Sequence, residues 1–166
     1  MRVMSTKRTT PKRTTLRDEI KQTKAFASLE AEVYLNLVRT SEALVTEANV
    51  LLRGFGLSGS QYNVLRILRG AGTAGLCGRD IAERMVTRDS DMTRLLDGLQ
   101  KKDLIARLRS EQDRRIVMAA ITDDGLALLA DIEEPLLALH RGQLGHLGDT
   151  RLKQFSRLLE DARHRP

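Results

Sequence analysis

The sequence has few of the residues on which several classes of protein depend. Among its 166 residues there is one cysteine, Cys77, there is no tryptophan, and aromatic residues make up 3%. One cysteine excludes an internal disulfide and a metal site built from several cysteines. So few aromatic rings argue against a stacking platform for single-stranded nucleic acid. No apolar run is long enough to span a bilayer or to act as a secretory signal, so we expect a cytoplasmic protein without a membrane partner.

The residue patterns of catalysis and cofactor binding are also missing. The histidines His140, His146 and His164 have no cysteine or carboxylate near them at a metal-ligand spacing on one helix face. Ser60 lacks a nucleophile-elbow pattern. The glycine-rich stretch 70–75 lacks the Gly-Lys-Ser/Thr ending of a phosphate-binding loop. We therefore expect no enzyme activity, no cofactor and no metal.

The net charge of +6 is concentrated at the N-terminus. Residues 1–17 hold 6 of the 28 basic residues and no acidic residue, which leaves 22 basic against 22 acidic residues in the remainder. With few apolar residues after Met4, this tail is expected to be disordered. It is a solvated leader, or an arm that adds salt-sensitive phosphate contacts. A cleaved transit peptide is a third interpretation of the same composition.

The centre of the chain predicts a helix-turn-helix. A helix is expected to begin after Thr87, as its N-cap, and to end near Lys102. Its apolar face carries Met92, Leu95, Leu96 and Leu99 at spacings of three and four. Its polar face carries Ser90, Arg94, Asp97 and Lys101, with Thr93 at the edge. A shorter helix at 80–85 and a tight connection precede it, and in such pairs the second helix enters a DNA major groove.

A β-hairpin is predicted directly after this helix. Residues 104–109 and 115–121 form two short strand-like runs, and the charged stretch 110–114 separates them. A hairpin in this position is a wing. Its tip can reach the minor groove or the flanking phosphates, where arginine is attracted by the negative potential.

A long helix is predicted near the N-terminus. Its apolar residues recur at intervals of three, four or seven and are Phe26, Leu29, Val33, Leu37, Leu44, Ala48 and Leu51. The helix starts near Thr15 or near Ser28, depending on whether it breaks, and Gly54 is the expected stop. Ser58 is expected to cap a second helix that runs to Arg69.

Two more helices are predicted after the hairpin. Thr122 is expected to cap the first, which Pro135 should bend because proline removes a backbone donor. The second begins near Asp149. Together with the N-terminal helix, they carry more apolar surface than a winged helix needs to cover itself. The surplus predicts a surface for a partner.

These motifs resemble those of the MarR (multiple antibiotic resistance regulator) family of winged-helix transcription factors. The resemblance covers roughly residues 57–129, and the segments that carry it are 57–65, 80–84, 93–105, 113–115 and 121–125. It implies a mainly α fold with a small β-hairpin wing, and a twofold homodimer formed by interlocking terminal helices. The two winged helices would then meet successive major grooves of a pseudo-palindromic site in double-stranded DNA.

The expected domain organisation follows from this resemblance and from the composition. Residues 1–17 are a disordered basic tail, and residues 18–56 are an N-terminal dimerisation helix. Residues 57–121 form the winged helix-turn-helix DNA-binding domain, and residues 122–166 form C-terminal dimerisation helices.

DNA contacts are expected from the second helix and from the tip of the wing. Arg94 can reach a guanine edge or a phosphate. An aspartate at the helix start suits the positive helix end or a cytosine amino group, and the sequence leaves that choice open. By resemblance, Asp113 orients an arginine that enters the minor groove. The expected residues are Arg88, Ser90, Asp91, Thr93, Arg94, Lys101, Asp113, Arg114 and Arg115; helix capping and a solvated hairpin tip are the structural alternatives.

The resemblance also implies a signal that releases DNA. In this family the signal is commonly a small, often aromatic, ligand or the oxidation of a cysteine. Tyr34, Arg39 and Tyr62 are the expected ligand-binding residues. Redox members carry their reactive cysteine near the first long helix, whereas Cys77 precedes the helix-turn-helix. A buried structural thiol is therefore favoured, and a redox sensor at Cys77 is the alternative.

The sequence thus predicts a bacterial, sequence-specific regulator of transcription that acts as a homodimer and represses, or less often activates, its target genes. Two other functions remain open. A nucleoid-type protein would bind any DNA through the basic tail. A helical interaction module with the same apolar surface would not bind DNA.

Overall fold

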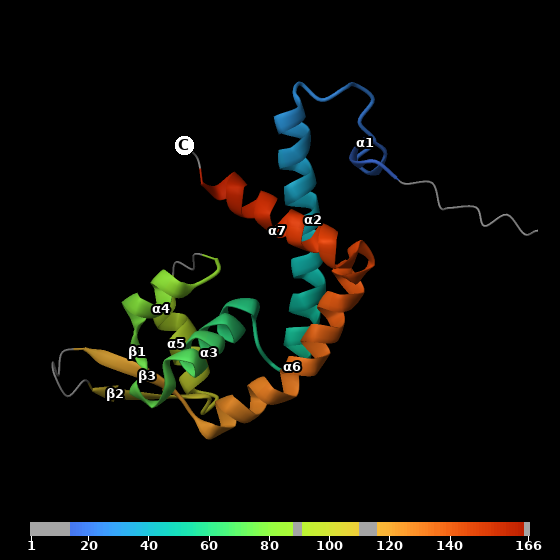
Figure 1. Cartoon of the computed structure of the whole chain (residues 1–166). Coiled ribbons are helices and arrows are strands. Elements are labelled where there is room, and N and C mark those ends of the chain that lie inside the picture. Colours follow the sequence, from blue (N-terminus) through green and yellow to red (C-terminus); the bar gives the residue numbers. More distant parts are fainter. Residues whose placement is uncertain (1–13, 88–90, 110–115, 165–166) are drawn as a thin grey trace, which may run out of the picture. The chain divides into compact units, whose positions relative to one another are not determined.

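A computed structural model describes residues 14–87, 91–109 and 116–164 of the chain (Figure 1). Most of these residues are helical. The chain divides into an N-terminal unit, Met1–Ala43, and a C-terminal unit, Leu44–Pro166. In the described residues no helix is both long and apolar enough to cross a membrane.

The N-terminal unit contains a short helix α1, Leu16–Glu19, and the first half of α2, Leu29–Gly54. The predicted long helix therefore breaks, and the later of its two expected starts is confirmed, with the Ser28 hydroxyl accepting from the Ala31 N–H at 3.2 Å. Thr15 caps α1, and its hydroxyl and N–H donate to the Asp18 carboxylate, which lowers the pKa of Asp18. Arg39 forms an ion pair with Glu19 at 3.4 Å.

The C-terminal unit begins within α2 and continues through four short helical segments and three strands. Helix α3, Gly59–Ala71, starts at the predicted cap, where Ser58 and Gln61 bond reciprocally to each other's backbone N–H groups. It ends two residues later than predicted. The elements that follow are η1 (Gly72–Ala74), β1 (Leu76–Cys77), α4 (Gly78–Arg84), α5 (Met92–Gln100), β2 (Ile105–Arg109) and β3 (Val117–Ile121).

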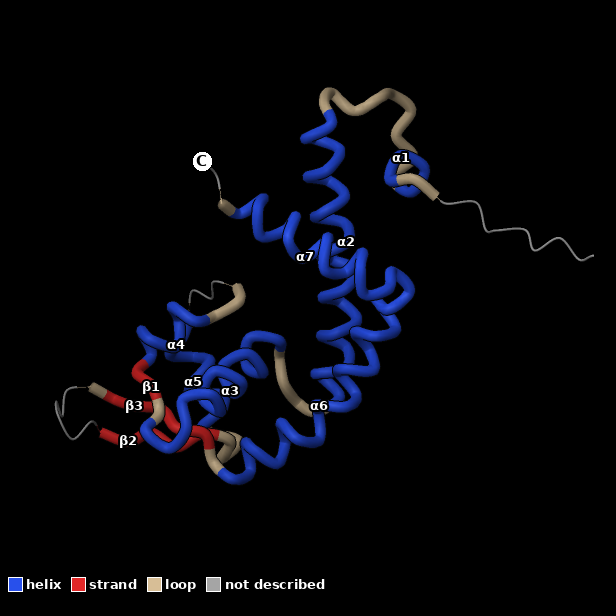
Figure 2. Tube along the Cα trace, in the orientation of Figure 1, coloured by secondary structure: helices blue, strands red, loops and turns tan. Residues whose placement is uncertain are grey.

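The three strands form an antiparallel sheet in the order β1-β3-β2, beside helices α3 to α5 (Figure 2). Ile105 pairs with Ile121 and Arg109 with Val117, so the predicted hairpin is confirmed. Strand β1 was not predicted, because two residues carry no alternation that a sequence pattern can detect. Gly75 precedes it with a φ of +67°, and a Cβ there would lie 2.4 Å from the Ala119 carbonyl oxygen.

One apolar core holds the C-terminal unit together. Its fully buried side chains come from the segment before α3, from α3, α4 and α5, and from the helix after the wing, and they are Leu57, Val64, Leu65, Leu68, Ile81, Leu99, Leu129 and Ile132. Arg69 of α3 also pairs with Glu133 at 3.3 Å. The helix-turn-helix and the wing therefore share their core with the helix that follows them.

The helix after the wing is α6, Asp123–Leu144, and its N-cap is Thr122, as predicted. It continues past Pro135 to the short η2, Gly145–Leu147. The last helix, α7, spans Gly148–Arg163 and starts one residue before the predicted position. The side-chain amide of Gln143 on α6 donates to the Leu44 carbonyl and to Glu47, which fixes the end of α6 against α2 within the same unit.

Two glycines of α6 differ in the space around them and provide a test of this packing. A Cβ at Gly125 would lie 2.4 Å from the Leu104 carbonyl oxygen, whereas a Cβ at Gly142 would meet no atom within 4 Å. Gly125→Ala is expected to lower the free energy of unfolding by about 1–3 kcal/mol through overpacking. Gly142→Ala should raise it by up to about 1 kcal/mol, because alanine favours a helix interior.

Urea unfolding at one protein concentration measures both variants. If Gly125→Ala and Gly142→Ala were equally stable, the backbone near Leu104 would have to shift to make room for the added methyl group.

Candidate nucleic-acid interface

Helix α5 presents two different faces. Leu96 and Leu99 are buried in the core, and Met92 and Leu95 pack against it, as the spacing predicted. Thr93 and Arg94 are exposed on the other side, and Lys101 is exposed at the C-cap. The core thus fixes the orientation of α5 and leaves its polar side chains at the surface.

The start of α5 differs from the prediction. The N-cap is Asp91, whose Oδ1 accepts from the Arg94 N–H at 2.9 Å, and Thr87 lies four residues earlier in the segment that connects α4 to α5. The prediction of Thr87 as N-cap was wrong. Aspartate caps helices at least as well as threonine, and no glycine or proline in the connection marks where it ends. The carboxylate of Asp91 therefore has a structural role at the positive end of the helix.

The polar face of α5 borders a shallow depression of about 600 Å³ that a residue from α3 completes. The lining residues are Gln61, Asp91, Thr93, Arg94, Asp97, Gly98 and Lys101. Gln61 was not predicted. Its Nε2 lies so close to α5 that a Cβ at Gly98 would stand 2.9 Å away. The sequence marks Gln61 as part of a helix cap but does not show which helix it faces.

Both ends of α5 are held by bonds from side chains. Asp91 acts at the first turn, and beyond the last turn the Lys102 ammonium group donates to the Gly56 carbonyl oxygen after α2. A bond across 46 residues of sequence has no local signature. The bond of Asp91 stabilises the first turn from within the helix, whereas the bond of Lys102 joins the end of α5 to the segment after α2.

The wing is joined to α5 by an ion pair. Arg107 on β2 donates from a terminal guanidinium nitrogen to Asp97 Oδ1 at 2.6 Å, and the Arg107 side chain is 27% exposed. Its Nε is buried without a hydrogen-bond partner in the part of the chain that the structure describes. Asp97 was placed on the polar face from its spacing, whereas Arg107 was not singled out. The pair fixes the base of the wing against α5.

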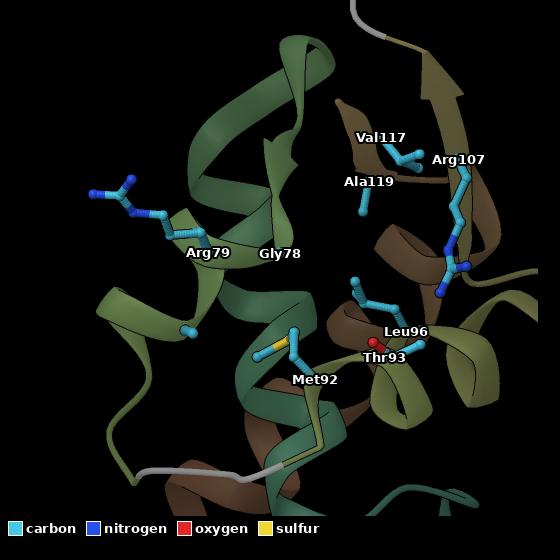
Figure 3. A pocket seen from close by; sticks show the side chains of 9 residues that line it. Gly78, Arg79, Met92, Thr93, Leu96, Arg107, Val117 and Ala119 are labelled. Atoms are coloured by element: carbon cyan, nitrogen blue, oxygen red, sulfur yellow. The ribbon is translucent and has the colours of Figure 1, made fainter. Parts of the chain in front are cut away.

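A cavity of about 480 Å³ lies beside this ion pair, between α4, α5 and the sheet (Figure 3). Met92, Thr93 and Leu96 line it from α5, and Val117 and Ala119 line it from β3. The guanidinium group of Arg79 points away from it, as Figure 3 shows. The cavity has a mostly apolar lining and opens at the surface of the unit.

Five of the predicted DNA-contacting residues lie outside the described residues. They are Arg88, Ser90, Asp113, Arg114 and Arg115. Of the other four, Asp91, Thr93, Arg94 and Lys101 lie together around the depression on α5. Their roles toward DNA remain predictions.

The three predicted ligand-binding residues belong to different units. Tyr34 and Arg39 lie on α2 in the N-terminal unit, where Tyr34 is exposed and Arg39 pairs with Glu19. Tyr62 lies in the C-terminal unit, where its hydroxyl accepts from Arg66 at 2.9 Å and the Arg66 guanidinium stands 5.8 Å from the centre of its ring. Each side chain is described within its own unit, and the ligand site stays a prediction.

Cys77 is half-buried rather than buried. It ends β1, pairs with Met118 across the sheet and occupies the N-cap position of α4 without a capping bond from its side chain. Its place in the sheet supports a structural role.

The comparisons of this chain with family models and with solved structures agree with one another. The model of the MarR family matches residues 57–117. A crystal structure of a MarR transcription factor from Planctomyces limnophilus is 41% identical to this chain, covers 82% of it and 98% of its own length, and has a TM-score of 0.65.

Two further relatives are similar over most of the chain. MdtR of Bacillus subtilis (strain 168), an HTH-type transcriptional repressor, is 30% identical over 102 residues, which cover 61% of this chain and 64% of MdtR. CouR from Rhodococcus jostii RHA1, crystallised with p-coumaroyl-CoA, is 26% identical, with 82% of this chain and 95% of CouR covered and a TM-score of 0.69.

The cap of α5 can be tested separately from its charge. Asp91→Ala is expected to lower the free energy of unfolding by about 0.5–2 kcal/mol, because it removes the acceptor for the Arg94 N–H. Asp91→Asn keeps an acceptor oxygen and should retain most of the stability. Thermal unfolding of both variants provides the measurement, and an equal loss in both would assign the effect to the carboxylate charge instead of the cap.

Proposed function

Because the chain belongs to the MarR family of transcriptional regulators, we propose that it is a homodimeric repressor that binds a pseudo-palindromic operator in double-stranded DNA. The family and the relatives consist of regulators of transcription and not of enzymes. The observation that carries the proposal is the division of α5 into a buried leucine face and an exposed face with Thr93, Arg94 and Lys101.

In the proposed complex α5 lies in the major groove. Arg94 stands one turn into the helix, where an arginine can donate to guanine O6 and N7 or to a phosphate. Thr93 and Lys101 contact the flanking backbone and keep the helix in register. Asp91 caps the helix, and the wing carries Arg114 or Arg115 to the minor groove with Asp113 as its orienting group, as the family resemblance implies.

The dimer is proposed from apolar surface on α2. Leu29, Val33 and Leu37 follow one another at spacings of four, so they share a helix face, and all three are exposed. A soluble chain seldom leaves such a stripe in water, and a twofold axis lets the same surface of a second copy cover it. Leu158 on α7 is also exposed and adds to the apolar surface at the chain's other end.

We further propose that a small aromatic ligand controls DNA binding, with Tyr34, Arg39 and Tyr62 as its contacts. The similarity to CouR, which was crystallised with p-coumaroyl-CoA, supports a ligand with an aromatic acyl group. The similarity to MdtR, a repressor, supports repression over activation. Such a regulator would act in the cytoplasm, beside the chromosome.

One observation favours a second candidate function, a nucleoid-type protein that binds any duplex. The six basic residues of the first 17, with no acidic residue among them, would add phosphate contacts that carry no sequence information. The two functions differ in how strongly the protein prefers one DNA sequence at physiological salt.

Binding to the DNA upstream of the protein's own gene tests the proposal. The full-length protein is titrated against that fragment and against random duplex at about 150 mM salt, where non-specific Kd values are around 10⁻⁴–10⁻⁶ M. Arg94→Ala is expected to weaken binding to the preferred fragment by about 1–3 kcal/mol, or roughly 5- to 150-fold in Kd. Arg157→Ala removes an equal charge from an exposed position on α7, on the face away from Leu152 and Phe155, and serves as the matched control.

An equal loss of affinity in Arg94→Ala and in the control variant on α7 would show that Arg94 contributes only its charge. Equal weak binding to both fragments would favour the nucleoid-type function or a target elsewhere in the genome, and selection from a random duplex library separates these two. The double variant Arg114→Ala/Arg115→Ala tests the wing in the same assay.

The dimer is tested by a charge placed on the apolar stripe. Leu37→Glu should convert the protein to a monomer at micromolar concentration, because a carboxylate would have to be buried at the twofold interface. Thr46→Glu adds the same charge to the opposite face of α2, nine residues and about 180° away, and should leave the dimer intact. Sedimentation equilibrium measures the mass of each, and a dimeric Leu37→Glu protein would place the interface elsewhere.

A further inference from the structure

The connection between α4 and α5 holds an apolar side chain out into solvent. Val86 is 86% exposed, more than any other large apolar side chain in the described residues. It directly follows Met85, the C-cap of α4, whose side chain packs against the core. Single exposed apolar residues are common on protein surfaces, so exposure alone assigns no role to Val86.

The backbone of Val86 is fixed, which distinguishes it from an ordinary surface residue. Its N–H donates to Asn63 Oδ1 at 2.8 Å, across 23 residues of sequence. Asn63 is half-buried on α3, next to the fully buried Val64 and Leu65. The connection is thus anchored to a helix of the core, and part of the backbone entropy cost of ordering Val86 for a contact has already been met.

Val86 lies in the connection between α4 and the N-terminal end of α5, and this place in the chain indicates what it contacts. In a helix-turn-helix the N-terminal residues of the second helix contact base edges in the major groove, so the connection that leads to this end comes close to the groove. On the base edges of that groove the apolar group is the C5 methyl of thymine. A valine held there has two methyl groups to pack against it.

We propose that Val86 packs on a thymine methyl group of the operator and that Asn63 is the positioning residue that holds the Val86 backbone for this contact. The inference rests on the proposed function and deepens it, because it assigns one base type in each half-site to one side chain. It adds an apolar specificity contact to the polar contacts proposed for Arg94.

The test removes one methyl group at a time from the DNA. Preferred duplexes are first selected from a random library with the full-length protein, and each thymine of the selected site is then replaced by deoxyuridine, which pairs in the same way without the methyl. Loss of one buried methyl is expected to weaken wild-type binding about fourfold at one thymine in each half-site. The other thymines of the same duplex are the internal control.

Variants of the protein assign the effect to Val86. Val86→Ala should bind the unmodified site about fourfold more weakly and lose the response to deoxyuridine at that position. Val86→Ile keeps the apolar group and should keep the response. Thr87→Ala, at the neighbouring exposed and β-branched residue, should respond as the wild type does.

The role of Asn63 is tested by the difference in binding between thymine and deoxyuridine duplexes, and not by affinity alone. Asn63→Ala removes the acceptor for the Val86 N–H and should reduce the methyl effect below twofold, while the thermal unfolding midpoint stays near the wild-type value because water can satisfy an exposed N–H. Asn63→Asp keeps an acceptor oxygen. It should weaken binding to all duplexes through its charge and preserve the ratio between the thymine and deoxyuridine sites.

Specific binding without a deoxyuridine effect at any thymine would overturn the inference and leave the proposed function intact. An effect that persists in Val86→Ala, or that disappears in Thr87→Ala, would also overturn it. A selection that yields no preferred sequence would overturn the proposed function and this inference together.

Discussion

Burial of one face of a nine-residue helix constrains the rest of the C-terminal unit. A helix as short as α5 is not stable alone, since isolated helices need about 12–15 residues even with favourable sequences. Its stability comes from Leu96 and Leu99, which are packed among side chains of α3, α4 and α6. The capping bond at Asp91 then stabilises the first turn of α5, and the bond from Lys102 to Gly56 holds the segment after its last turn. The exposed face of α5 depends on all of these contacts.

The periodicity of leucines predicted most of this unit. Spacings of three and four located α5 and its buried face, and single capping residues such as Ser58 and Thr122 located the starts of α3 and α6 to the residue. These features are local, because a helix repeats every 3.6 residues and a cap bonds within its own first turn. The predicted start of α5 was wrong, because the short connection contains two residues that can cap a helix, Thr87 and Asp91.

Part of the candidate site could also be predicted from local features. The outward position of Arg94 follows from the helical repeat, so the sequence was sufficient to find it. The contacts of Gln61 with α5, of Asp97 with Arg107 and of Asn63 with Val86 join different elements. Such pairs depend on how the elements pack, and a single sequence carries no signal for them. The sequence therefore predicts which side chains face outward but not which neighbours hold them in place.

The glycine before β1 has a consequence for how this protein evolves. Gly75 has a positive φ, and any side chain there would run into the Ala119 carbonyl, so nearly every missense change in its codon damages the sheet. The outward residues of α5 contribute little to the core, so substitutions at Arg94 or Thr93 cost little stability. Selection can thus retune what the helix recognises over generations while the scaffold stays unchanged. Duplicated copies of the gene would be expected to diverge in their targets well before they diverge in fold.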